Sequence, residues 1–98
     1  MIVKKFKLNG TYPIDASIDA IRDQRAKDRI LARIRRLALG NRGDYKNIEG
    51  NLYELRIDVG QGWRVYYTQE NSELVLLMIV GSKPDQSKDI EKIKGWLS

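Results

Sequence analysis

Two arginines, Arg56 and Arg64, have the side-chain type and the spacing to bind one phosphate group together. Apolar and polar residues alternate over residues 52–58 and again over 62–68, which predicts two strands, each buried on one face. The short turn between them predicts an antiparallel hairpin. The register that sets apolar residues against apolar residues also sets Arg56 opposite Arg64. Directly opposed like charges destabilise a sheet, so we expect an anion between the two guanidinium groups.

The same register fixes which other residues of the hairpin face one another. It predicts the cross-strand pairs Tyr53 with Tyr67, Leu55 with Val65, Ile57 with Trp63 and Glu54 with Tyr66. Glu54 then shares a face with the arginines, either as a proton-transfer group or in a plain salt bridge. In a purely structural alternative, each arginine simply pairs with Glu54 or Asp58. On the same face Tyr66 could donate a hydrogen bond or stack on a base, and Lys46 could bind phosphate.

The composition is that of a basic protein without the commonest metal ligands. The 98 residues include 18 Lys and Arg against 13 Asp and Glu, a formal net charge of +5. This charge favours an acidic partner, such as nucleic acid or an acidic protein surface. Cysteine and histidine are absent, which removes thiolate and imidazole ligands and the usual general base. We therefore expect no metal and no cofactor.

Neither end of the chain nor its apolar runs predict contact with a membrane. The longest apolar run, residues 74–80, is far shorter than the ~20 residues of a membrane-spanning helix. The N-terminus lacks the apolar region of a secretory signal. We therefore predict a cytoplasmic location.

Hydrophobic periodicity predicts one α+β domain over residues 1–98. Strands are expected at 2–8, 45–48, 52–58, 62–68 and 73–80, and helices at 14–21, 24–39 and 85–97. Short connections between the later strands favour antiparallel pairing. We predict a curved antiparallel sheet with two N-terminal helices and one C-terminal helix. The helices are expected on one face, with the other face partly open.

Four arginines recur at helical spacing on the second predicted helix: Arg25, Arg29, Arg33 and Arg36. They would share one face of that helix. One interpretation is a solvated face, partly paired with Asp23 and Asp28. The alternative is a docking surface for an acidic partner.

Several segments, in their order and spacing, resemble the RelE/ParE toxin superfamily, and within it the HigB-like group of addiction module killer proteins. The segments are Gly40-Asn41-Arg42-Gly43-Asp44-Tyr45-Lys46, Tyr53-Glu54-Leu55-Arg56-Ile57, Gly62-Trp63-Arg64-Val65-Tyr66-Tyr67, Gly81-Ser82-Lys83 through Gln86, and Asp89-Ile90. The resemblance covers nearly the whole domain, and it implies a RelE-like fold.

The resemblance also implies a function, namely the toxin of a bacterial type II toxin–antitoxin system. Many such toxins are endoribonucleases that cleave messenger RNA, commonly on the ribosome, by attack of the 2′-hydroxyl. The implied partners are the messenger RNA, the ribosome and a cognate antitoxin, often of the helix-turn-helix type, whose complex with the toxin binds operator DNA. Two other functions stay open. One is a non-enzymatic inhibitor of DNA gyrase, as in the ParE branch, and the other is a catalytically inactive antitoxin-binding module.

The resemblance assigns roles to residues of the open sheet face. Arg56, Arg64 and Lys83 correspond to the basic cluster of the ribonuclease members and are the predicted catalytic residues, together with Glu54. Glu54 stands where the best-known ribosome-dependent members have lysine, and Asp89 lies near the position of their catalytic tyrosine. These two departures leave the groups that transfer protons unassigned. The predicted RNA-binding residues are Lys46, Tyr66 and Arg64.

Overall fold

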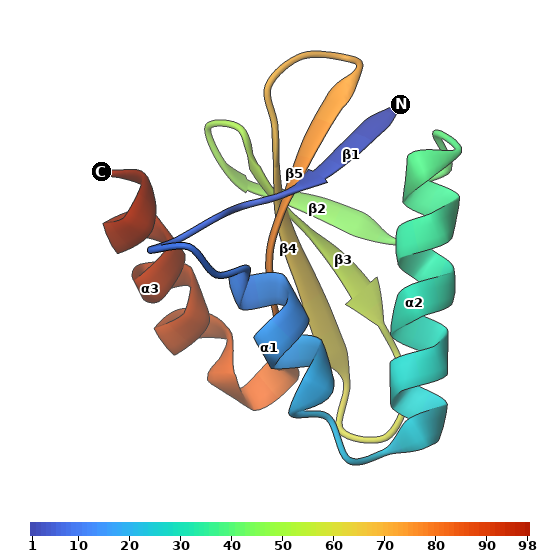
Figure 1. The fold of residues 1–98 in the computed structure, drawn as a ribbon. Helices are drawn as coiled ribbons and strands as arrows, with labels where there is room; N and C mark the ends of the chain where they lie inside the picture. The colour runs from blue at the N-terminus through green and yellow to red at the C-terminus, as the bar shows by residue number, and fades with distance from the viewer.

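Five strands and three helices follow one another in the order that the sequence predicts, which confirms the α+β class. The computed structural model describes residues 1–98. The elements are β1 (Ile2–Lys5), α1 (Pro13–Asp19), α2 (Gln24–Ala38), β2 (Tyr45–Glu49), β3 (Leu52–Ile57), β4 (Trp63–Gln69), β5 (Leu74–Ser82), a 3-10 turn (Lys83–Asp85) and α3 (Gln86–Leu97) (Figure 1). None of the helices has the length and apolar character needed to cross a lipid bilayer.

The sheet is mixed rather than antiparallel, because β1 lies parallel to β5. The strand order is β1-β5-β4-β3-β2, and the other three neighbouring pairs are antiparallel. Ile2 lies beside Leu74 and Lys5 beside Leu77, so β1 borders only the first part of β5. The prediction of a fully antiparallel sheet is therefore wrong at β1. Two helices separate this strand from the rest of the sheet, so its direction does not follow from a hairpin-length connection.

The hairpin of β3 and β4 has the predicted register. Its partners include Tyr53 with Tyr67, Glu54 with Tyr66, Leu55 with Val65, Arg56 with Arg64, and Ile57 with Trp63. A slip of one residue would move the apolar side chains of a strand to the opposite face. The apolar alternation therefore fixes the position of the two arginines.

One apolar core lies between the first two helices and one face of the sheet. Its members include Ile14 of α1, Ile30 and Leu37 of α2, and Leu55, Val65 and Tyr67 of the sheet. The helix α2 begins at Asp23, whose carboxylate accepts hydrogen bonds from the backbone N–H groups of Arg25 and Ala26. This N-cap satisfies donors that would otherwise lack partners, and so fixes where the helix starts.

A second apolar core lies under α3, on the opposite face of the sheet. It contains Leu52, Tyr66, Met78, Ile79 and Ile93. In Figure 1 the strands lie between α3 and α2. The prediction that all helices share one face is therefore wrong. Val65, Tyr66 and Tyr67 are buried in succession along β4, so this strand is apolar on both faces and both need a cover.

Arg33 of α2 joins that helix to the sheet through three backbone carbonyl groups. Its Nη1 donates to the carbonyl oxygen of Arg56 at 2.7 Å. Its Nη2 donates to the carbonyl oxygens of Arg42 at 2.9 Å and Asp44 at 3.0 Å. Burial lowers the pKa of this guanidinium, and the Asp44 charge opposes that effect. Arg33 therefore stabilises the fold and is not a freely solvated member of the arginine row.

The other arginines of the row are exposed on α2, namely Arg25, Arg29 and Arg36. The predicted pairing with Asp23 and Asp28 is wrong, because none of the salt bridges involves these two carboxylates. Asp23 caps the helix instead, and Asp28 accepts a hydrogen bond from the side chain of Gln24 at 2.8 Å. Both carboxylates therefore accept hydrogen bonds from donors near the start of α2 instead of pairing with the arginines.

Replacing Arg33 by methionine should destabilise the protein by about 2–4 kcal/mol, because three carbonyl groups lose a charged donor. The measurement is the free energy of unfolding from denaturant titration. Arg29→Met, an exposed position on the same helix, is the matched control and should change this free energy by less than about 0.5 kcal/mol. Equal effects of the two substitutions would contradict the structural role of Arg33.

Candidate anion-binding site

The side chains of Arg56 and Arg64 meet at the carboxylate of Glu54. Glu54 Oε2 lies 2.9 Å from Arg64 Nε and 3.2 Å from Arg56 Nε. The Arg56 contact is a hydrogen bond, whereas the Arg64 contact is an ion pair in which the N–H is not aligned with the oxygen. Asp58 takes no part. A carboxylate of the chain itself thus relieves the repulsion, so the expectation of an anion directly between the two groups is wrong and the alternative salt bridge to Glu54 is confirmed.

The remaining oxygen of Glu54 is also occupied. Gln86, in the first turn of α3, donates from Nε2 to Glu54 Oε1 at 2.6 Å. Only 1% of Glu54 is exposed. Each oxygen therefore faces at least one donor, and the carboxylate is held in one orientation by groups from β3, β4 and α3. Such a group positions its neighbours well.

Both arginines keep N–H donors that bind no other group of the chain, although only 8% of the Arg64 side chain is exposed. Arg64 donates from Nη1 to the carbonyl oxygen of Trp63 at 3.0 Å, and its Nη2 makes no hydrogen bond within the chain. The two terminal nitrogens of Arg56 make none either, and 34% of its side chain is exposed. Two guanidinium groups and one carboxylate carry a net charge of +1. The cluster can therefore still bind a phosphate oxygen from its solvent side.

Two of the predicted lysines extend this basic surface at its borders. Lys46 of β2 lies directly opposite Glu54 on β3 and is exposed. Directly opposed residues of an antiparallel pair share a face, so Lys46 lies on the face of the ion cluster. Lys83 follows β5 and is also exposed. Its backbone N–H donates to the carbonyl oxygen of Gly62 at 2.9 Å, which ties it to the residue before β4.

Tyr66 lies on the predicted face but inside the protein. None of its surface is exposed, and its hydroxyl has no hydrogen-bond partner. Burial raises the pKa of this phenol, and the nearby charges of Glu54 and Asp89 raise it further. A ring without an exposed surface has no face on which a base could stack. The structure therefore does not support the predicted contact between Tyr66 and an RNA base, because α3 covers the ring. The alternation of residues along β4 does not show where α3 packs, so it could not predict this burial.

The structure also brings Asp89 to this region, where its carboxylate lies against the backbone of β5. Asp89 Oδ2 fills the position that a Cβ would take at Gly81, the residue paired with Arg64. Asp89 is 8% exposed, and this oxygen has no hydrogen-bond partner. Burial raises the pKa of the carboxyl. The folded protein therefore binds this proton more tightly than the unfolded chain, so Asp89 costs stability as the pH rises above its ordinary pKa.

The sequence did not predict the contacts of Asp89 with Gly81 and of Gln86 with Glu54. Both contacts depend on where α3 packs on the sheet, which local patterns do not show. One signal for the first contact is present in the sequence. Gly81 is an isolated glycine at the end of an apolar strand, and such a glycine often marks the close approach of another group. Gln86 carries no comparable signal. No group of three or more acidic, histidine or cysteine side chains is arranged to hold a metal ion.

Comparison of sequences identifies one relative of this chain. An uncharacterized protein of Haemophilus influenzae is 43% identical over 88 residues, which make up 90% of this chain and 89% of the relative. The chain belongs to the same family as that protein. No family model matches the chain, and no solved structure matches it. Because the relative carries no stated activity, the function has to be argued from the site itself.

Replacing Glu54 by glutamine should destabilise the protein by about 2–4 kcal/mol, because two opposed guanidinium groups would then lack their shared counter-charge. Glu49→Gln is the matched control, since Glu49 pairs with Lys94 at 3.0 Å on the exposed surface, and its loss should cost less than about 1 kcal/mol. Thermal unfolding with and without inorganic phosphate measures both effects. Phosphate should stabilise the Glu54 variant more than the native protein, and equal responses would exclude the proposed repulsion.

Replacing Gly81 by alanine should cost about 1–3 kcal/mol, since the new methyl group would overlap the Asp89 carboxylate. Gly95→Ala is the control, because a Cβ at Gly95 of α3 meets no other atom and should stabilise the helix by about 0.5–1 kcal/mol. Denaturant unfolding gives both values. If Gly81→Ala lowers the free energy of unfolding by the same amount in the native protein and in an Asp89→Ala variant, overlap with the Asp89 carboxylate is not the cause of the loss.

Proposed function

We propose that this protein is the toxin of a type II toxin–antitoxin system and acts as an endoribonuclease on messenger RNA bound to the ribosome. The observation that carries the proposal is the pair of arginines on one sheet face. Glu54 contacts both guanidinium groups, and each keeps N–H donors that bind no other group of the chain. The resemblance of the surrounding segments to the RelE/ParE superfamily supports the same reading, with β2 to β5 as the antiparallel part of a RelE-like fold.

In this proposal the arginines act on the phosphate at which the RNA chain is cut. The 2′-hydroxyl loses its proton to water as its oxygen bonds to the adjacent phosphorus. The bond from phosphorus to the 5′-oxygen then breaks, the 5′-oxygen takes a proton from water, and a 2′,3′-cyclic phosphate is left. Arg64 Nη2 and the terminal nitrogens of Arg56 stabilise the negative charge of the phosphorane. Lys46 and Lys83 bind neighbouring phosphates, where each lysine acts as a point charge. Positioning and charge stabilisation supply most of the acceleration.

Glu54 serves in this proposal as a positioning residue rather than as the proton acceptor. Both of its oxygens are engaged by Arg56, Arg64 and Gln86. Removing the carboxylate would release both guanidinium groups from their fixed positions. Loss of geometry of this kind costs catalysis even where no reacting atom is touched.

The proposed partners follow from the same assignment. A cognate antitoxin of the helix-turn-helix type covers the basic face, and the complex of the two proteins binds operator DNA. The proposed site of action is the cytoplasm, where ribosomes carry the messenger RNA. The charge of +5 is consistent with binding to RNA.

A second candidate is a non-enzymatic toxin that binds DNA gyrase. One observation favours it, namely that the basic face holds no free general base. Histidine is absent, Glu54 is fully engaged and Tyr66 is buried. The same observation fits a catalytically inactive module that only binds the antitoxin, in which case expression without antitoxin would be harmless.

Induced expression in bacteria, followed by mapping of transcript ends, tests the proposal. The native protein should arrest growth and create new transcript ends. Arg56→Gln keeps the ion pair between Arg64 and Glu54, and it should reduce RNA cleavage by about 100- to 1000-fold because it removes donors to the phosphorane. Arg36→Gln, an exposed position on α2, should retain full cleavage.

Other outcomes of this experiment separate the candidates. Intact transcripts together with DNA breaks and SOS induction would reject the ribonuclease and support gyrase as the target. Full cleavage by the Arg56→Gln variant would refute the role assigned to the arginine pair. Circular dichroism of each variant confirms that the fold is retained.

A further inference from the structure

A cleft of about 540 Å³ lies beside the outer edge of β5, between α1 and the start of α3. The strand β1 pairs with β5 only as far as Leu77, so residues 78–82 have no strand beside them on this edge. The edge is closed at one point by a side chain, because the backbone N–H of Val80 donates to Ser17 Oγ of α1 at 2.9 Å. Beyond this contact, Gly81 and Ser82 line the cleft, and a strand edge without a neighbouring strand can accept a further extended segment.

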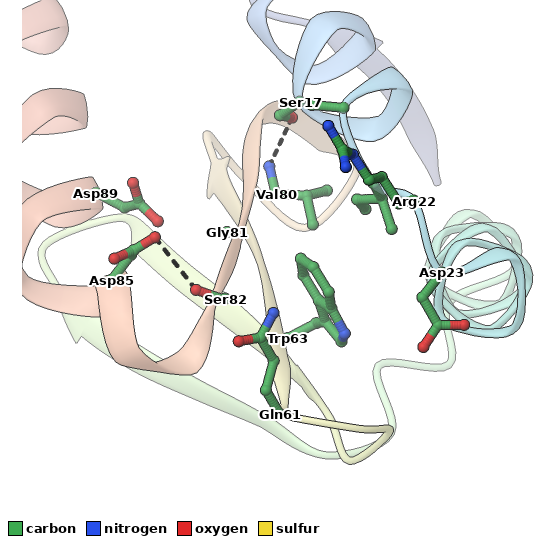
Figure 2. A pocket seen from close by; sticks show the side chains of 12 residues that line it. Ser17, Arg22, Asp23, Gln61, Trp63, Val80, Gly81, Ser82, Asp85 and Asp89 are labelled. Carbon is green, nitrogen blue, oxygen red and sulfur yellow. Dashed lines mark hydrogen bonds between the residues drawn. The ribbon is translucent and has the colours of Figure 1, made fainter.

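The charge inside the cleft is opposite to that of the whole protein. Its lining includes the carboxylates of Asp23, Asp85 and Asp89 but only one cation, Arg22, although the chain carries +5. Figure 2 shows Asp85 and Asp89 on one side of the cleft, Arg22 and Asp23 on the other, and Trp63 between them. A cationic group is therefore the complementary ligand.

Asp89 is the one of these carboxylates that the protein leaves without a donor. Asp23 caps α2, and Asp85 accepts a hydrogen bond from Ser82 Oγ at 3.2 Å. Asp89 is more than nine-tenths buried, and its Oδ2 has no partner. An unpaired buried acceptor destabilises the protein, so a ligand that donates to this carboxylate would relieve that cost.

Trp63 contributes an unmatched donor to the same cleft. Its indole Nε1 is buried and has no acceptor, and its ring lines the cleft. A ligand that satisfied both side chains would need a donor for Asp89 and an acceptor for Trp63. An arginine residue within a peptide has both, since its guanidinium donates to carboxylates and its backbone carbonyl accepts. The aromatic ring can also stack against the guanidinium plane.

We propose that this cleft binds an arginine side chain carried by an extended segment of a partner protein. The guanidinium donates to Asp89, and the segment lies along residues 80–82 of β5, which line the cleft, with a backbone carbonyl toward Trp63. The inference rests on the cleft alone and does not depend on the ribonuclease assignment.

The test is a titration of the full-length, ¹⁵N-labelled protein with the blocked peptide acetyl-Val-Arg-Val-amide, followed by NMR. The chain has two tryptophans, Trp63 in the cleft and Trp96, which stacks on Phe6 of the second core. The Trp63 indole signal should shift and saturate, whereas the Trp96 signal should stay in place. A Trp96→Phe variant identifies which signal is which.

Two comparisons make the result specific. The same peptide with neutral citrulline in place of arginine should bind at least about tenfold more weakly, because charged hydrogen bonds are the stronger ones. Asp89→Asn should weaken binding of the arginine peptide by a similar factor. This variant keeps the side-chain shape over Gly81 and removes a buried charge, so it should fold at least as stably as the native protein at neutral pH. Glu91→Gln removes the same charge from an exposed site on α3 and should bind like the native protein.

Three results would overturn the proposal. The first is the absence of a saturable shift at Trp63. The second is equal binding of the arginine and citrulline peptides, or equal binding by Asp89→Asn and Glu91→Gln. The third is a homodimer, detected by sedimentation, that Asp89→Asn dissociates, because an arginine of a second copy would then occupy the cleft in place of a partner.

Discussion

The contact of Glu54 with Arg56 and Arg64 is the interaction on which the candidate site depends. The hairpin register forces two permanent cations to directly opposed positions, and neither can move away without breaking the apolar pairing around it. A single carboxylate, 1% exposed, balances them both. Because the two arginines share this carboxylate, each guanidinium contacts it through the Nε–H group alone. The same contact therefore stabilises the sheet and leaves other N–H donors of both guanidinium groups without a partner in the chain.

The helix α3 links this ion cluster to the second core and to the cleft beside β5. Gln86 binds Glu54, Ile93 packs in the core with Tyr66, and Asp89 lies against Gly81. One helix thus contacts the ion cluster, the apolar face and the open strand edge. A partner that bound the cleft at Asp89 would act on the same helix that holds Glu54 through Gln86.

Local patterns predicted the hairpin better than they predicted its surroundings. Alternation over β3 and β4 was sufficient for the register and for the opposition of Arg56 and Arg64, since strand parity admits few alternatives. It placed Glu54 on the same face but did not decide between its salt bridge and an anion bound by the arginines. The parallel pairing of β1 was not accessible, because a strand followed by two helices carries no signal for its direction. The burial of Tyr66 depends on where α3 docks, and this is a property of the tertiary structure. The isolated glycine at position 81 indicated that some group approaches the backbone there, but the sequence did not identify that group as Asp89.

The most direct test of the central claim follows the side-chain Nε–H signals of Arg56 and Arg64 by NMR while inorganic phosphate is added. Both nitrogens contact Glu54, so an anion bound at the other donors of both groups should perturb both signals. If the two arginines bind one anion together, the two signals shift together and give one shared Kd. Independent Kd values, or no shift in either signal, would contradict the view that the two arginines form a single anion-binding unit.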